Sequence, residues 1–129
     1  MPLQGEYEPS TVDWVREQVE AYESSGGTEA LTLRDTGLPV VVVTSVGARS
    51  GNLRKNPLMR VEHAGSYLAV GSQGGAPTDP HWVRNMREHP QIELQDETSK
   101  WDMTARELTG DERAEWWERA VEAFPNYAK

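Results

Sequence analysis

The stretch LPVVVVTSVGARSGNLRKNPLMRVE, residues 38–62, decides the fold of this 129-residue chain. Its first part, 38–46, is apolar and β-branched, which is typical of a strand buried on both faces. The two-glycine segment 47–52 predicts a turn, and residues 53–62 predict a returning strand. Pro57 inside that strand predicts a sheet edge or a bulge, because proline has no N–H to donate. The stretch therefore predicts an antiparallel hairpin.

Three helices are predicted around this hairpin. Apolar residues at helical spacing predict a helix that begins near Ser10 and stops at the Ser-Ser-Gly-Gly segment 24–27. This helix either lies on the core or acts as a lid or membrane-surface helix, although its polar face is mixed in sign rather than basic. A short helix is predicted over residues 80–88, and an amphipathic one from 109 to about 124.

Further strands are predicted over residues 67–72, 91–95 and 101–108. Consecutive strands joined by short turns must run antiparallel. The expected fold is therefore α+β and mainly β, a small barrel or sandwich with helices at its edges, rather than a doubly wound parallel sheet.

Length and composition restrict the function. The length fits one domain, with residues 1–9 as a flexible lead and residues 10–129 as the folded unit. The net charge of −8 argues against general nucleic-acid binding. The absence of cysteine excludes disulfides and a cysteine nucleophile, and fits a cytoplasmic location. No signal peptide and no membrane-spanning stretch are predicted.

Several reaction classes lack their motifs. The sequence contains no GxGxxG, no P-loop and no GxSxG. His63, His81 and His89 do not have the spacing of a zinc site, so no metal is expected.

A basic segment stands out in an otherwise acidic chain. Residues 44–61 contain four basic residues and no acidic one, against nine basic and 21 acidic residues elsewhere. This segment is either a solvated hairpin or an anion site, in which turn glycines free backbone N–H groups and Arg49, Arg54 and Lys55 add charge.

A second glycine-containing segment, Ser-Gln-Gly-Gly-Ala-Pro at 72–77, follows a predicted strand. It is either a simple connection or a place where a ligand approaches the backbone closely. Trp82 and Asn85 lie on the following short helix, where Trp82 is either a core residue or a platform for a ring.

These motifs together resemble the coenzyme F420 (deazaflavin)-dependent nitroreductase and quinone reductase family. The matching pieces are G-A-R-S-G-x-x-R-K-N-P at 47–57, S-x-G-G-A-P at 72–77 and P-x-W-x-x-N at 80–85, and the likeness runs from about residue 22 to 127. The resemblance implies a split β-barrel like that of flavin mononucleotide (FMN) oxidases. It also implies hydride transfer from reduced F420 to a small electrophile such as a quinone or a nitroaromatic compound.

The resemblance also implies a site. The cofactor's anionic tail would lie on the basic hairpin, its ring system on the hairpin's apolar end, and its deazaflavin head on the glycine loop. The cofactor-binding residues it implies are Arg49, Ser50, Arg54, Lys55, Asn56, Pro57, Leu58, Met59, Ser72, Gln73, Gly74, Gly75, Ala76, Pro77, Trp82 and Asn85. Ser72 and Tyr127 are the candidates to protonate or orient the acceptor, which would make them the catalytic side chains.

The sequence departs from the family pattern in two places. Gln73 stands where members commonly carry lysine, so one cationic contact is expected to be missing. The sequence ends at Lys129, before the family's further tyrosine region and last strand, so we expect part of the pocket wall and one barrel strand to lie outside it. A non-catalytic carrier of F420, or a binder of FMN, remains the alternative function.

Overall fold

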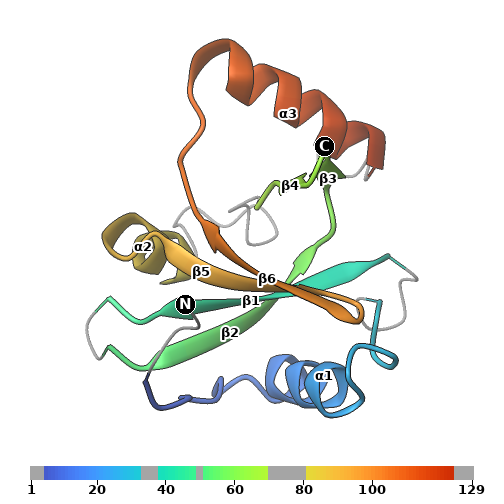
Figure 1. Cartoon of the computed structure of the whole chain (residues 1–129), viewed down its shortest axis with the longest axis vertical. Coiled ribbons are helices and arrows are strands. Elements are labelled where there is room, and N and C mark those ends of the chain that lie inside the picture. Colours follow the sequence, from blue (N-terminus) through green and yellow to red (C-terminus); the bar gives the residue numbers. More distant parts are fainter. Residues whose placement is uncertain (1–4, 33–37, 49–50, 70–80, 124–129) are drawn as a thin grey trace.

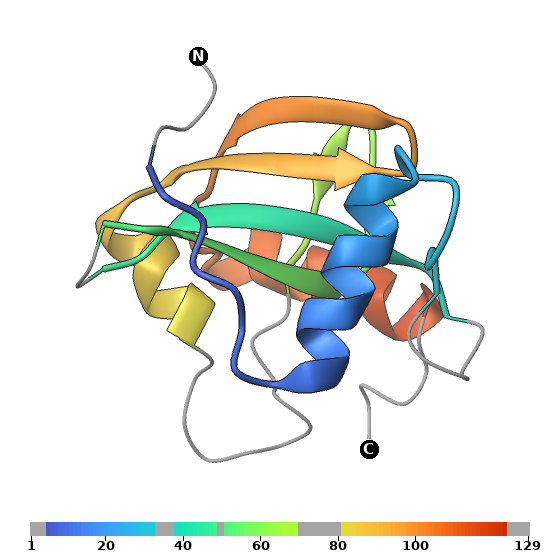
Figure 2. The same ribbon diagram turned by 90° about the horizontal axis from the view of Figure 1, so that it is seen from below.

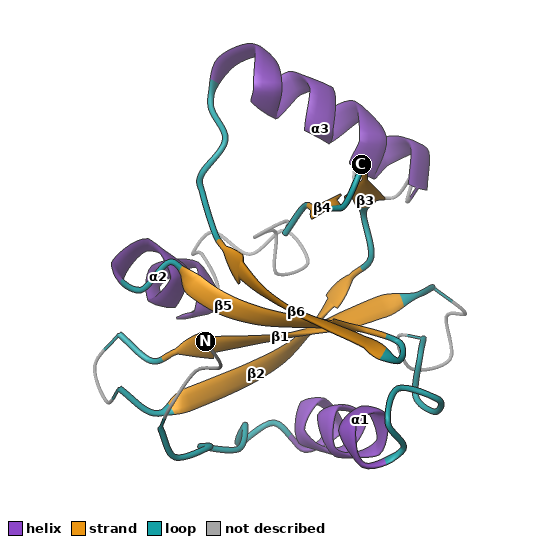
Figure 3. Cartoon of the chain, viewed as in Figure 1, coloured by secondary structure: helices purple, strands orange, loops and turns teal. Residues whose placement is uncertain are grey.

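The computed structural model describes residues 5–32, 38–48, 51–69 and 81–123. The chain order alternates helices with groups of strands (Figure 1, Figure 3). The elements are α1 (Asp13–Ser24), β1 (Val40–Val46), β2 (Leu53–Met59), β3 (Glu62–His63), β4 (Ser66–Tyr67), α2 (His81–Glu88), β5 (Gln91–Asp96), β6 (Ser99–Thr104) and α3 (Gly110–Ala123).

A four-stranded antiparallel sheet in the order β2-β1-β5-β6 forms the centre of the fold, and β3 and β4 form a separate two-stranded ribbon. This confirms the expected α+β class and its antiparallel strands. Pro57 lies on β2 at the edge of this sheet, as predicted. Within the described residues the sheet is open, so the split barrel stays a prediction.

The valine run of β1 supplies the core on both sides of the sheet. Val40 and Val42 pack with Val19 and Tyr22 of α1. Val41 and Val43 of β1 form a second buried cluster with Ile92 and Leu94 of β5 on the other face. Figure 1 shows the same division, with α1 on one side of the sheet and α3 with the β3–β4 ribbon on the other. The strand is therefore buried on both faces, as its composition predicts.

Two strands are shorter than predicted because long-range contacts redirect the chain. β2 ends at Met59, where the N–H of Arg60 donates to the carbonyl of Pro39 and Val61 joins a cluster with Trp116 of α3. β6 ends at Thr104, where the N–H of Ala105 donates to the carbonyl of Pro90. Residues 70–72 of the predicted strand 67–72 lie outside the described residues.

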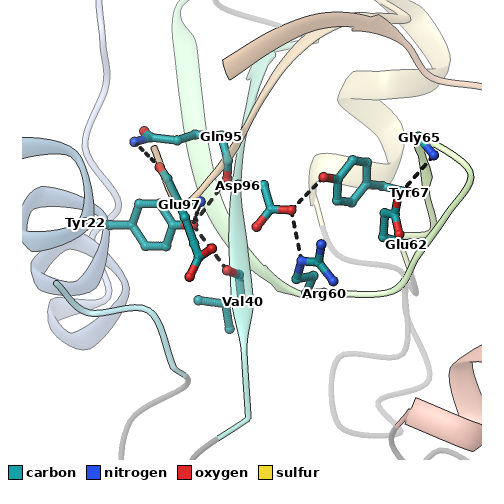
Figure 4. Close-up of polar contacts among 9 residues, drawn as sticks. All are labelled: Tyr22, Val40, Arg60, Glu62, Gly65, Tyr67, Gln95, Asp96 and Glu97. Atoms are coloured by element: carbon teal, nitrogen blue, oxygen red, sulfur yellow. Dashed lines mark hydrogen bonds and ion pairs between the residues drawn. The ribbon is translucent and has the colours of Figure 1, made fainter. Parts of the chain in front are cut away.

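The first helix is joined tightly to the turn between β5 and β6. Tyr22 is fully buried, and its hydroxyl accepts the N–H of Glu97 at 2.6 Å (Figure 4). Gly27 follows the helix at φ +85°, and a Cβ added there would lie 1.7 Å from the carbonyl oxygen of Glu97. Only glycine fits this position, which confirms the Ser-Ser-Gly-Gly segment as the helix stop.

Residues 5–8, assigned by the sequence to a loose lead, are hydrogen-bonded to the edge of β2. The N–H of Leu53 donates to the carbonyl of Glu6 at 2.7 Å, and the N–H of Glu8 donates to the carbonyl of Leu53 at 2.8 Å. Tyr7 and Leu53 thereby form a parallel bridge. Figure 2 shows this part of the chain running alongside the sheet before it enters α1.

Candidate functional site

The basic hairpin is neutralised by acids from distant parts of the chain. Arg54 Nη1 lies 3.0 Å from Glu8 Oε2, and Lys55 Nζ lies 2.5 Å from Glu23 Oε2 on α1. Arg60 forms a third pair, with Asp96. Each described cation of the segment 44–61 therefore has a carboxylate partner, and the local excess of charge in the sequence is not an excess in space.

Strand alternation divides the predicted cofactor residues of β2 between two faces of the sheet. Lys55, Pro57 and Met59 pair with Thr44, Val42 and Val40, and they lie on the face that α1 covers. The alternate residues Arg54, Asn56 and Leu58 lie on the opposite face, where Leu58 packs against the cluster of Val41 and Val43. A ligand on that opposite face meets only the second set of side chains.

The short helix α2 is fixed to the turn between β1 and β2. Asn85 is buried, and its Oδ1 accepts the backbone N–H of Ala48 at 2.9 Å. Trp82 is buried one turn earlier on the same helix. The turn closes through the N–H of Gly47, which donates to the carbonyl of Asn52, and the N–H of Gly51, which donates to the carbonyl of Gly47. Asn85 thus holds two of the predicted motifs together.

The remaining predicted site residues lie outside the described residues. These are Arg49, Ser50, Ser72, Gln73, Gly74, Gly75, Ala76, Pro77 and Tyr127.

A polar cluster around the buried carboxylate of Asp96, at the far end of the sheet, was not predicted. Asp96 is 8% exposed, and its Oδ2 accepts the Tyr67 hydroxyl at 2.6 Å and Arg60 Nε at 2.9 Å (Figure 4). Burial and the bond to Asp96 raise the pKa of Tyr67 to about 12. The sequence signal was weak, because Asp96 ends a strand at a turn, where aspartate is common.

Tyr67 also borders a shallow hollow of about 320 Å³ beside β6. Its ring centroid lies 6.0 Å from that of Trp101, and the guanidinium carbon of Arg60 lies 5.9 Å from the Tyr67 ring centroid. The hollow is lined by Glu62, Gly65, Tyr67, Trp101, Asp102 and Met103.

Among the described residues, no helix combines the length and the apolar character needed to cross a bilayer. The described residues also bring together no cluster of three or more His, Cys, Asp or Glu side chains suited to a metal ion.

Known proteins match both the sequence and the fold. A solved structure of an F420-H2 dependent reductase (FDR-A) is 49% identical, with a TM-score of 0.67 over 70% of this chain and 80% of that chain. A second solved structure, described as a domain-swapped dimer, is 47% identical, with a TM-score of 0.69 over 92% of this chain and 88% of that one. The fold and the first of these matches define the class, F420-H2 dependent reductases.

The family model for F420H(2)-dependent quinone reductases matches residues 14–129. A Mycobacterium tuberculosis protein named "Putative F420H(2)-dependent quinone reductase" is 26% identical over 70% of this chain and 76% of its own length. An F420H(2)-dependent quinone reductase of the same species is 28% identical over 53% of this chain, but the match spans only 46% of that relative. The chain belongs to the F420H(2)-dependent quinone reductase family.

Proposed function

We propose that this protein transfers a hydride from reduced coenzyme F420 to a quinone or another small electrophile, such as a nitroaromatic compound. The family match supports this activity, and reduced F420 supplies the hydride when it is bound. The protein's part is to bind and orient the coenzyme and the acceptor, and to limit the access of water.

We propose the face of the sheet that carries Arg54, Asn56 and Leu58 as the coenzyme site. The supporting observation is the hydrogen bond from the N–H of Ala48 to Asn85, which fixes the β1–β2 turn against α2 beside that face. The donors fit an anionic tail, because Arg54 already binds a carboxylate in this structure. Lys55, Pro57 and Met59 act from the other face, by holding β2 in place.

The assignments outside the described residues remain part of this proposal. The loop residues Ser72 to Pro77 would contact the deazaflavin head, with Arg49 and Ser50 at the tail. Ser72 or Tyr127 would donate a hydrogen bond to the acceptor oxygen.

Anaerobic turnover of reduced F420 with menadione tests the proposal. We expect fast oxidation that depends on the protein. Coenzyme binding without turnover would favour the non-catalytic carrier, and tighter binding of FMN than of F420 in a tryptophan-fluorescence titration would favour a flavin protein.

Arg54→Ala tests the tail site, and Lys55 is left in place because it pairs with Glu23 on the other face. We expect weaker binding of F420 and a flatter dependence of its Kd on salt. Arg113→Ala is the matched control, because it removes an exposed arginine from α3, away from the β2 edge. Equal Kd values for both variants and the parent would remove the tail site from the proposal.

We also propose that this chain forms a dimer by exchange of α3, since a relative 47% identical is a domain-swapped dimer. Helix α3 stands clear of the four-stranded sheet in Figure 1, at the end of the connector 105–109. Among the described residues, Trp116 and Ala120 of α3 pack on Val61, and the Trp116 ring lies edge-on to that of His63. Light scattering of the full chain tests this, and removal of residues 110–129 should abolish the dimer.

A further inference from the structure

The carboxylate of Glu8 lies between two side chains of the β1–β2 hairpin. Asn52 Nδ2 donates to Glu8 Oε1 at 3.2 Å, and Arg54 Nη1 donates to Glu8 Oε2 at 3.0 Å. Each carboxylate oxygen therefore has its own donor, one of them charged. We call Asn52 and Arg54 the cradle, and its donor set is that of a carboxylate-binding site.

Glu8 belongs to residues 5–8, a segment at the edge of the sheet that the following contacts among the described residues hold in place. Two backbone hydrogen bonds join Glu6 and Glu8 to Leu53, at the outer edge of β2. The ring of Tyr7 adds a contact with Lys55, whose Nζ lies 5.2 Å from the ring centroid. Gly5 and Glu6 are exposed and Tyr7 and Glu8 are half-buried, and an edge segment of this kind separates from the sheet at a low free-energy cost compared with global unfolding.

The neighbouring ion pair is different in kind. The side chains of Lys55 and Glu23 are 18% and 24% exposed, whereas those of Arg54 and Glu8 are 36% and 45% exposed. Glu23 is part of α1, which packs on the core through Tyr22. An incoming anion can therefore replace Glu8 without moving a helix, but it cannot replace Glu23 in that way.

We propose that the cradle binds the carboxylates of an incoming ligand by displacing Glu8, so that residues 5–8 compete with the glutamyl tail of coenzyme F420. This proposal rests on the function proposed above and adds a regulator of the same site. The exchange replaces one carboxylate with another, so the cradle keeps its charge.

Glu8→Gln, with Glu6→Gln as the control, tests the competition. Both variants lose one negative charge from the same segment, but Glu6 is exposed and its side chain is not in the cradle. We expect Glu8→Gln to tighten F420 binding about three- to fivefold, the size of one exposed ion pair, with Glu6→Gln unchanged. The deazaflavin alcohol that lacks the phosphate and the glutamyl tail should bind all three proteins equally.

Hydrogen exchange gives a readout that does not depend on turnover. The amide N–H groups of Glu8 and Leu53 are bonded across the edge of β2, so displacement should speed their exchange when F420 binds. Unchanged or slower exchange on binding, or equal F420 affinity in both variants and the parent, would overturn the proposal.

A second ligand distinguishes failure of the cradle proposal from failure of the proposed function. If the parent protein binds no F420, the proposed function is wrong. A γ-linked triglutamate is then titrated by calorimetry, and tighter binding to Glu8→Gln than to Glu6→Gln still supports the cradle. Equal binding, or none, overturns it. Thermal unfolding of each variant checks that the fold is intact.

Discussion

Arg54 and Lys55 are adjacent in the sequence, yet they lie in two regions of different kinds. Lys55 faces α1 and forms a mostly buried pair with Glu23, whereas Arg54 faces the other way and meets Glu8 at the half-exposed edge of β2. The first pair joins a helix to the sheet, and the second joins a short terminal segment to it. A basic motif can thus be divided by strand alternation into a half that stabilises the fold and a half that remains accessible to ligand.

The largest effect is expected for Tyr22→Ala, which removes the packing of α1 on the sheet. Tyr22 is fully buried between α1 and β1, so its removal should lower the free energy of unfolding by about 3–5 kcal/mol. Tyr22→Phe keeps the ring but leaves the N–H of Glu97 without the hydroxyl, and should cost about 1–2 kcal/mol. Urea unfolding measures both. Equal losses of stability in the two variants would mean that the hydroxyl group of Tyr22, rather than the packing of its ring, joins α1 to the sheet.

Exchanging each cation for methionine sharpens the contrast between the two pairs. Lys55→Met leaves Glu23 without its partner at a mostly buried site and should cost about 1–2 kcal/mol of stability. Arg54→Met should cost no more than about 0.5 kcal/mol, because both partners are well exposed. For F420 affinity we expect the opposite order, in which Arg54→Met weakens binding more than Lys55→Met does. Urea unfolding and coenzyme titration on the same two variants decide, and a parallel ranking in the two assays would contradict the division.

A smaller effect is expected at the polar cluster of Arg60, Tyr67 and Asp96. Burial and Asp96 raise the pKa of Tyr67 from 10.0 to about 12, so the folded state holds its proton more tightly than the unfolded state does. The stability contributed by this proton is complete below pH 10 and is lost as the pH rises from 10 to about 12. Tyr67→Phe should weaken this decline in unfolding free energy, and ultraviolet titration of the variant should lose the ionisation of one tyrosine near pH 12. An unaltered alkaline profile would contradict the assignment.

Local patterns were sufficient for most of the fold. The β-branched run at 40–43 predicted a strand buried on both faces, and Pro57 predicted an edge strand; both are confirmed. Strand ends were less predictable. Nothing near Arg60 in the sequence indicates that its partner is Asp96, which lies 36 positions later and helps to draw the chain away from β2.

The candidate site was harder to read for the same reason. The charge of residues 44–61 could be counted from the sequence, but Glu8 and Glu23 are separated from Arg54 and Lys55 by 46 and 32 positions. Long-range pairing therefore hides the fact that these cations are already neutralised. The sequence did allow a prediction that Asn85 lies near the hairpin, because the P-x-W-x-x-N motif and the hairpin motif both pointed to the same site.

The central place of β1 in the sheet has a consequence for synthesis. β1 pairs with β2, which follows at once, and with β5, which follows only after α2. While a ribosome makes the intervening residues, Val41 and Val43 remain exposed to solvent, because Leu94, which later packs against them, has not yet been synthesised. A nascent chain halted in that interval presents an unpaired, β-branched strand edge, the kind of surface that aggregates. Slow codons between β2 and β5 should therefore reduce the yield of folded protein more than slow codons after β6.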